Sequence, residues 1–199
     1  MKSVYLQSKL ILKSVSTCYI ERLVIILKNI WNPSVALDVH AISNPHFPLT
    51  ESVHKNLIKL YLNDVGMLTT QLYDRNIKPI IDDIKSVNLG AVYESVVAQE
   101  LRSHGYKLFY YDNRNKGEVD FIIDDYNNTS VLPIEVKSGR DYSIHSALNN
   151  LISTDEYNVK SAFVLSNERE VKRKDKILYL PIYYIMFINN LEGETSDIF

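Results

Sequence analysis

Glycine is scarce in this chain, with six residues among 199, at positions 66, 90, 105, 117, 139 and 193. Loops that cradle phosphate groups need glycine where backbone amides approach the ligand closely, as in the patterns GxGxxG and GxxxxGK. No two of these glycines have the spacing of either pattern. The sequence therefore excludes a P-loop and a dinucleotide-binding fingerprint, and we expect no nucleotide cofactor.

Cysteine is scarcer still, and Cys18 is its single occurrence. One cysteine forms neither an intramolecular disulfide nor a multi-cysteine zinc cluster, and it suits a reducing compartment. None of the five histidines falls in an HExxH pattern and no serine lies in GxSxG, so zinc-hydrolase and triad-esterase readings have no local support. We expect a cytoplasmic protein.

The chain also lacks a strong net charge and a long apolar run. Its 22 lysines and arginines against 24 aspartates and glutamates give a formal charge of -2, which supplies no global field for attracting nucleic acid or an anionic membrane. Any contact with DNA must then come from a local basic face. The apolar stretch 23–27 is bracketed by charged residues and is far shorter than the about 20 residues of a spanning helix, so we expect no membrane partner.

The length and the hydrophobic pattern predict one domain, or one domain with a small appendage. The first thirty residues favour a pair of amphipathic helices, closed by Trp31-Asn32-Pro33, with a partner-binding helical face as the alternative. A short strand at Ala36–Ile42 and an extended connection or β-wing around Pro45 and Pro48 follow. Next come a strand-like run at Ile58–Leu62 and a helix over Met67–Tyr73.

The segment that begins at Asn88 has the clearest helical pattern. Its apolar side chains recur at spacings of three and four: Leu89, Val92, Tyr93, Val96, Val97 and Leu101. The dipeptide His104-Gly105 is typical of a helix C-cap. We therefore predict a helix that ends near Gly105.

After this helix the period changes to that of strands. Three β-rich runs, at 107–111, 118–124 and 131–137, are separated by two clusters of turn-forming residues, and the short intervals predict a meander. A helix over 144–153, a strand over 161–166, a charged loop over 168–176 and an apolar run over 177–188 complete the order. The resulting αβββαβ order predicts a mixed α/β core with a later helix packed on the sheet.

The second and third of these strands carry the candidate chemistry. Asp120 lies between apolar residues of the middle strand, and Glu135 and Lys137 stand at the end of the third. Side chains alternate along a strand, so Glu135 and Lys137 point the same way, and a hairpin neighbour can bring Asp120 to that end. Two carboxylates and an ammonium suit a hard divalent cation such as Mg²⁺ or Mn²⁺. An exposed strand face with a cross-strand ion pair is the alternative.

A third carboxylate candidate comes from the predicted helix. Glu94 lies beside Tyr93 and one turn before Val97, near the apolar stripe of the helix. Glu100 competes with it from a different face of the helix, and a solvated helix glutamate is the remaining alternative.

Several ordered motifs resemble one known family. They are the helix segment Gly90–Leu101 (GAVYESVVAQEL), the strand segment Gly117–Ile122 (GEVDFI) and the strand segment Pro133–Gly139 (PIEVKSG), with Leu60–Leu68 (LYLNDVGML) and Phe47–Leu49 (FPL) upstream. Together they resemble the DUF4143 domain, the C-terminal part of a large group of prokaryotic AAA-type ATPases. The resemblance covers residues 35 to 188, approximately.

The resemblance implies a fold similar to that of restriction endonucleases of the PD-(D/E)xK type. The pattern of that superfamily is a helix-borne Glu, an Asp on the second strand and an ExK on the third, which carries over to Glu94, Asp120, Glu135 and Lys137. Val119 stands where the superfamily motif has proline. Resemblance of fold does not by itself establish cleavage.

The resemblance also sets the expected domain organisation. The ATPase half of the family, with its P-loop, has no counterpart in this sequence, so we expect a shortened or stand-alone relative. We expect residues 1–56 to form an N-terminal helical extension similar to the tail of a winged-helix region, and residues 57–199 to form a nuclease-like α/β domain.

Two functions follow as hypotheses. In the first, a divalent-metal-dependent nuclease-like domain acts on DNA: Asp120 and Glu135 bind Mg²⁺ or Mn²⁺, Glu94 helps directly or through water, and Lys137 orients the attacking water. In the second, a non-catalytic module keeps the fold and binds DNA or an AAA-type ATPase partner. The four intact site residues favour the first hypothesis. The missing motor half, the negative net charge and the lack of a clear basic face favour the second.

Overall fold

The structure is a computed structural model that describes residues 36–73, 78–81, 89–139 and 143–188. The helices expected within the first thirty residues lie outside this described part. No helix of the described residues is long and apolar enough to cross a membrane.

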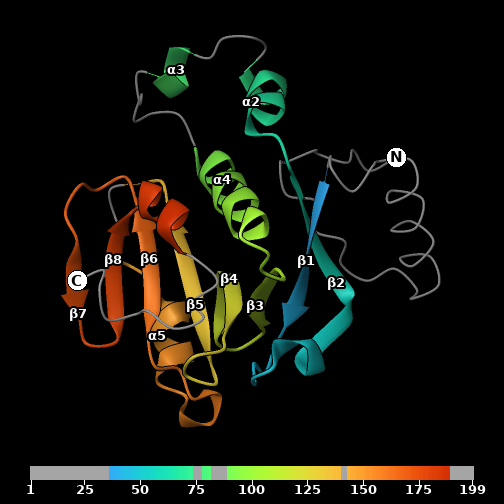
Figure 1. Ribbon diagram of the computed structural model, residues 1–199, viewed down its shortest axis with the longest axis vertical. Helices are drawn as coiled ribbons and strands as arrows, with labels where there is room; N and C mark the ends of the chain where they lie inside the picture. Colours follow the sequence, from blue (N-terminus) through green and yellow to red (C-terminus); the bar gives the residue numbers. More distant parts are fainter. Residues whose placement is uncertain (1–35, 74–77, 82–88, 140–142, 189–199) are drawn as a thin grey trace.

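An eight-stranded mixed sheet forms the centre of the molecule (Figure 1), with strand order β2-β1-β3-β4-β5-β6-β8-β7. The strands are β1 (Ala36–Ile42), β2 (Val53–Leu62), β3 (Phe109–Asn113), β4 (Gly117–Asp125), β5 (Ser130–Lys137), β6 (Ala162–Ser166), β7 (Lys172–Lys174) and β8 (Ile177–Pro181). The chain segment β3-β4-β5 is the antiparallel meander predicted from the sequence. Parallel pairs join β1 to β3, β5 to β6 and β6 to β8, so the fold is of the mixed α/β class.

Helices cover both faces of the sheet. The α-helices are α2 (Val65–Tyr73), α3 (Lys78–Ile81), α4 (Gly90–Ser103) and α5 (Ser146–Ile152), and the 3-10 helices are η1 (Leu49–Ser52), η2 (Asp155–Tyr157) and η3 (Ile182–Phe187). Figure 1 shows α4 in front of the central strands and α5 behind them. Each helix contributes to its own apolar cluster on the sheet, α4 through Val97 and Leu101, and α5 through Leu148 and Leu151. Each such leucine or valine contributes about 1.5–3 kcal/mol when fully buried.

Helix α4 confirms the clearest prediction from the sequence. Within the apolar stripe read at spacings of three and four, Val97 and Leu101 are fully buried in the cluster on the sheet. Leu89 and Val92, at the start of the helix, pack in a separate cluster with Leu68 of α2. The helix ends before His104, and Gly105 takes the left-handed conformation with φ 86°, which costs glycine little.

Two parts of the chain differ from the prediction, and a third bears on the expected domain boundary. The charged segment 168–176 contains the short edge strand β7, all of whose residues are exposed. The apolar run 177–188 divides into β8 and η3 at Pro181, which has no N–H to continue a ladder. The boundary expected after residue 56 lies within β2, which pairs with β1 in the same sheet. The division into two domains stays a prediction.

Candidate functional site

A break in the strand register positions Asp120. Between β3 and β4 the pairs Phe109↔Ile122 and Tyr111↔Val119 leave Asp120 and Phe121 opposite a single residue of β3. This two-against-one arrangement is a β-bulge, a feature that redirects side chains and recurs next to active sites. The redirected carboxylate of Asp120 accepts a hydrogen bond from the backbone N–H of Val136, at 2.8 Å from Oδ2.

Glu135 and Lys137 stand at the end of β5 as predicted. The Nζ of Lys137 lies 2.6 Å from Oε1 of Glu135, and the glutamate is only 6% exposed. Ile134 and Val136, which alternate with these two residues, belong to the apolar cluster under α4. The alternation of charged and core positions along this strand is therefore confirmed.

The second oxygen of Glu135 is the exceptional feature of this strand end. Its Oε2 is buried and has no hydrogen-bond partner among the described residues. A buried carboxylate oxygen without a donor or cation carries an uncompensated desolvation cost. The site is thus built to accept a positive charge or a hydrogen-bond donor at this atom.

Glu94 faces the same region from α4. Its Oε2 accepts a hydrogen bond from the hydroxyl of Tyr61 at 2.8 Å. Tyr61 is a buried residue of β2 whose ring packs on Phe121, with 5.5 Å between the ring centroids. Burial and then the charge of Glu94 raise the pKa of the Tyr61 hydroxyl, so the hydroxyl stays protonated and remains a donor to Glu94.

The electrostatics of Asp120 link these carboxylates into one cluster. Burial, followed by the negative charges of Glu135 and Glu94, raises the pKa of Asp120 to about 8. The hydrogen bond from Val136 and the charge of Lys59 act in the opposite direction. Glu94 is thus the helix carboxylate that acts on Asp120, rather than its competitor Glu100. Glu94 and Glu135 thus lie within electrostatic reach of Asp120, and Lys137 pairs with Glu135. The catalytic roles of these residues stay a prediction.

The donor set limits the kind of metal site that fits. Within the described residues no group of three or more His, Cys, Asp or Glu side chains is arranged to hold a metal ion. Mg²⁺ is commonly held by one or two carboxylates, with water and substrate phosphate completing its shell. Asp120 and the open oxygen of Glu135 fit that simpler arrangement. Glu94, already engaged by Tyr61, suits contact through a water better than direct ligation.

Lys59 is a residue of this region that the sequence reasoning missed. It lies on β2 with 0% exposure, its ammonium pairs with Glu118, and its Nζ stands 4.1 Å from the centroid of the Tyr110 ring. One feature of the sequence could have indicated this position. Lys59 lies two residues before Tyr61 inside the apolar run Ile58–Leu62, so the two side chains share one face of the strand. A charged residue within an apolar strand is either on its exposed face or paired in the interior.

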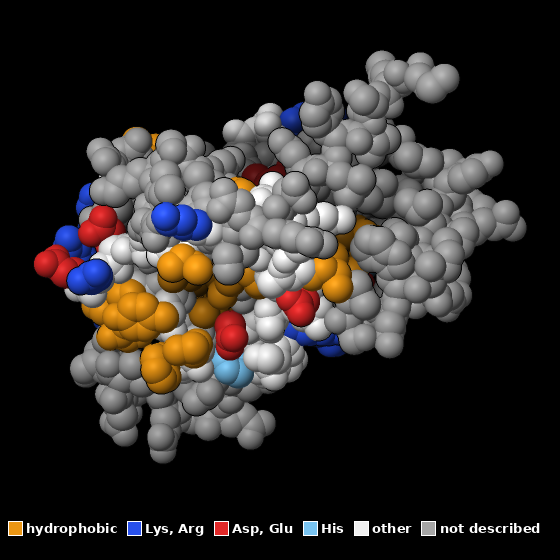
Figure 2. Space-filling view, turned by 90° about the horizontal axis from the view of Figure 1, so that it is seen from above, with side chains coloured by type: hydrophobic (Ala, Val, Ile, Leu, Met, Phe, Trp, Pro, Cys, Tyr) orange, Lys and Arg blue, Asp and Glu red, His pale blue; other side chains and the backbone are white. Residues whose placement is uncertain are grey.

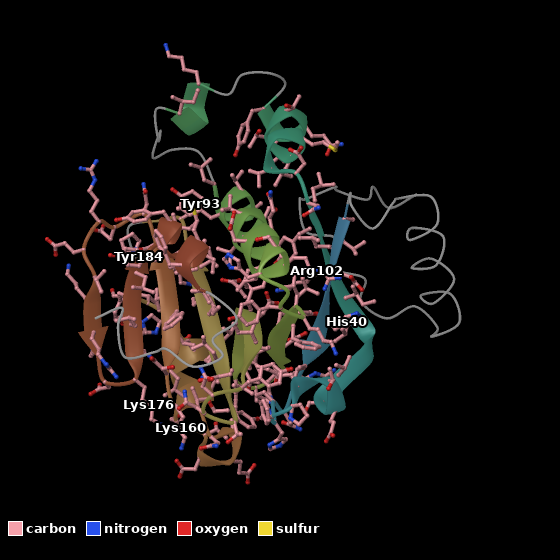
Figure 3. The ribbon with its side chains drawn as sticks, in the orientation of Figure 1. His40, Tyr93, Arg102, Lys160, Lys176 and Tyr184 are labelled. Atoms are coloured by element: carbon pink, nitrogen blue, oxygen red, sulfur yellow. The ribbon has the colours of Figure 1, made fainter. Side chains whose placement is uncertain are left out.

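The exposed lysines at the far end of the sheet are separate from this cluster. Figure 3 places Tyr93, the neighbour of Glu94, toward the upper part of α4, and Lys160 and Lys176 at the lower end of the sheet. The basic strand β7 is the fourth neighbour of β4 in the sheet, about 19 Å away at the usual strand spacing. The segment 168–176 contains β7 and begins two residues after Ser166, which pairs with Lys137 of β5. Its first residues therefore lie at the same edge of the sheet as Glu135 and Lys137, whereas β7 itself lies three strands away from β5.

The comparison with known proteins yields one match. A family model with the description "Domain of unknown function (DUF4143)" matches residues 89–185. No curated protein and no solved structure matches the chain. The matched segment contains Glu94, Asp120, Glu135 and Lys137, whereas Lys59 and Tyr61 precede it.

Proposed function

The chain carries a DUF4143 domain at residues 89–185, and from this premise we propose a divalent-metal-dependent nuclease-like function that hydrolyses phosphodiesters of DNA. The order α4, β3-β4-β5, α5, β6 supports a restriction-endonuclease-like core. The observation that carries the proposal is the buried oxygen of Glu135, which has no partner in the described part of the chain. Beside it, burial and then the neighbouring carboxylates raise the pKa of Asp120. Such a cluster is short of positive charge. A divalent cation would supply that charge and would allow a negatively charged phosphate to approach the carboxylates.

Asp120 and Glu135 would hold Mg²⁺ or Mn²⁺, with Glu94 beside them. When bound, the divalent cation supplies positive charge to the phosphate oxygens and lowers the pKa of a bound water. The protein's part is to fix the ligands before substrate arrives. The N–H of Val136 holds Asp120, and the hydroxyl of Tyr61 holds Glu94.

Lys137 has the position of a water-orienting residue. Its ammonium pairs with Glu135 and its side chain is 29% exposed. An ammonium has three donors, so Lys137 keeps donors for a water or a phosphate oxygen. An ammonium held in this way also offsets the charge that develops on the phosphoryl group.

The test is cleavage of duplex, branched and single-stranded DNA by the purified chain with Mg²⁺ or Mn²⁺. We expect Glu135→Gln and Lys137→Met to lower turnover at least about 100-fold, with folding checked by circular dichroism. The chain offers a matched control. Glu170 and Lys172 are also two positions apart and form an exposed ion pair, with 3.1 Å between Nζ and Oε2, and Lys172 lies in the edge strand β7. Glu170→Gln and Lys172→Met should cleave like the wild type. A wild type that is inert on every substrate, or cleavage that survives Glu135→Gln, contradicts the proposal.

A second function, a non-catalytic module that binds DNA or an AAA-type ATPase, has its own support. Lys59 already supplies one positive charge close to the carboxylates, which reduces the need for a metal ion. The exposed large hydrophobic residues include Tyr183, Met186 and Phe187 of η3, and such patches are typical of protein contacts. Figure 2 shows hydrophobic side chains gathered on the upper face, with lysines and arginines scattered rather than massed there. An inert wild type that co-purifies with an ATPase would favour this function.

A further inference from the structure

Lys59 extends the site beyond the residues that the sequence pattern supplied. We propose that Lys59 is a built-in counter-cation of the carboxylate cluster, which balances the site when no metal is bound and weakens its affinity for divalent cations. The inference rests on the proposed function in one respect: the cluster of Asp120 and Glu135 is taken as a cation site. It concerns a residue of β2, outside the segment matched by the family model.

The position of the Lys59 ammonium is the first argument. It pairs with Glu118 of β4 and lies over the ring of Tyr110 on β3. Tyr110 is the β3 residue opposite the bulge that carries Asp120. The ammonium thus contacts residues of the two strands that form the bulge, and its charge acts on Asp120.

Burial is the second argument. A fully buried ammonium is stable only when it is paired and its donors are used, and Lys59 has 0% exposure. A carboxylate and an aromatic face together compensate it. Lys59 cannot contact a substrate phosphate from this interior position, so it is a positioning residue that acts through Glu118 and Asp120.

The balance of charges is the third argument. The region gathers the carboxylates of Glu94, Glu118, Asp120 and Glu135 around the ammoniums of Lys59 and Lys137. Among the residues that the structure describes, one oxygen of Glu135 has no partner. Removing Lys59 would deepen the deficit of positive charge, and a divalent cation would fill it more tightly. Loss of one unit of positive charge from this cluster is expected to raise the affinity for a divalent cation on the order of tenfold.

The experiment replaces Lys59 by methionine, which keeps most of the stem and removes the charge, in the full chain. Mn²⁺ binding is measured by titration calorimetry, and thermal unfolding is followed in EDTA and in Mg²⁺. We expect Lys59→Met to bind Mn²⁺ about tenfold more tightly than wild type. We also expect it to lose several °C of melting temperature in EDTA and to recover most of that loss in Mg²⁺, because a ligand that binds the folded state stabilises it.

The matched control is Lys116→Met. Lys116 also lies over a tyrosine ring, 5.0 Å from the centroid of Tyr157, and donates to Thr154. Tyr157 belongs to the apolar cluster on the α5 face of the sheet. This variant should bind Mn²⁺ like the wild type, because its lysine does not face the carboxylates.

The outcomes separate the counter-cation role from the proposed function. Equal Mn²⁺ affinity of wild type and Lys59→Met, or a melting loss that Mg²⁺ does not reduce, means that Lys59 is merely structural and leaves the metal site standing. Binding by Lys59→Met but not by wild type supports Lys59 as the resident cation and overturns metal-dependent catalysis. If neither binds Mn²⁺, both proposals fall. Should Lys59→Met not fold, Lys59→Gln, which can still donate to Glu118, carries the same test.

Discussion

Asp120 is the residue on which the charges of the site converge. Burial and the neighbouring carboxylates Glu135 and Glu94 raise its pKa to about 8, against the opposing charge of Lys59. In the unfolded chain the same carboxyl ionises near its ordinary pKa of 3.8. The folded state therefore binds more protons than the unfolded state between these two values. The contribution of this carboxyl to the free energy of unfolding is therefore fully present below the unfolded-state pKa. It is lost as the pH rises through the folded-state pKa.

Asp120→Asn should remove this pH-dependent penalty. In EDTA the variant and the wild type should have similar melting temperatures near pH 4. The variant should become the more stable of the two as pH rises, by about 3 °C or more at pH 9. Thermal unfolding followed by circular dichroism from pH 4 to 9 provides the measurement. A difference that stays constant over this range would show that the Asp120 carboxyl is not ionising at a cost.

The same residues mark what the sequence could predict of the site. Glu135 and Lys137 are two positions apart in a strand, so alternation alone places them together. Lys59 and Glu118 are 59 positions apart, and no local pattern links them. The bulge at Asp120 is also invisible in the sequence, because it depends on how β3 and β4 pair. Local spacing in the sequence thus predicted the pair Glu135 and Lys137. The pairing of distant strands, which the sequence does not show, brings Lys59 and its positive charge to the site.

At the scale of elements, Gly117 governs how closely α5 approaches β4. The glycine opens β4 with φ 96°, and a Cβ added to it would lie 2.8 Å from Cβ of Ala147 in α5. Gly117→Ala should therefore combine backbone strain with a steric clash and destabilise the fold by about 2 kcal/mol or more. Chemical denaturation measures the loss. Gly139→Ala is the control, since an added Cβ there meets nothing within 4 Å, and equal stability of the two variants would contradict the explanation.

Element prediction succeeded where a segment has its own periodic signal. The strand Ala36–Ile42 has the predicted bounds, and α4 follows from its apolar stripe. β7 was missed because a strand of three exposed basic residues has no apolar alternation. The parallel pairing of β1 with β3 was not predicted either, because partners so distant along the chain leave no local trace.

At the scale of the whole molecule, the matched segment and the strands before it share one core. The apolar cluster beneath α4 includes Leu37, Val39 and Ala41 of β1 and Tyr61 of β2. β1 also covers the edge that β3 would otherwise expose. The mixed α/β class was predictable from the αβββαβ order, but this dependence on the upstream strands was not.

A fragment that begins at residue 89 should therefore fail to fold cooperatively. It would lose the buried side chains of β1 and β2, each large one contributing about 1.5–3 kcal/mol. The summed contribution of these side chains is comparable to the free energy of unfolding of a typical native protein, about 5–15 kcal/mol. Glu118 would also lose Lys59, its ion-pair partner. We expect the full chain to give dispersed amide NMR signals and a single unfolding transition, and the fragment to give collapsed signals and no transition. A fragment that melts cooperatively would show that the family segment folds alone, and β1 and β2 would then be an accessory to the sheet rather than part of its core.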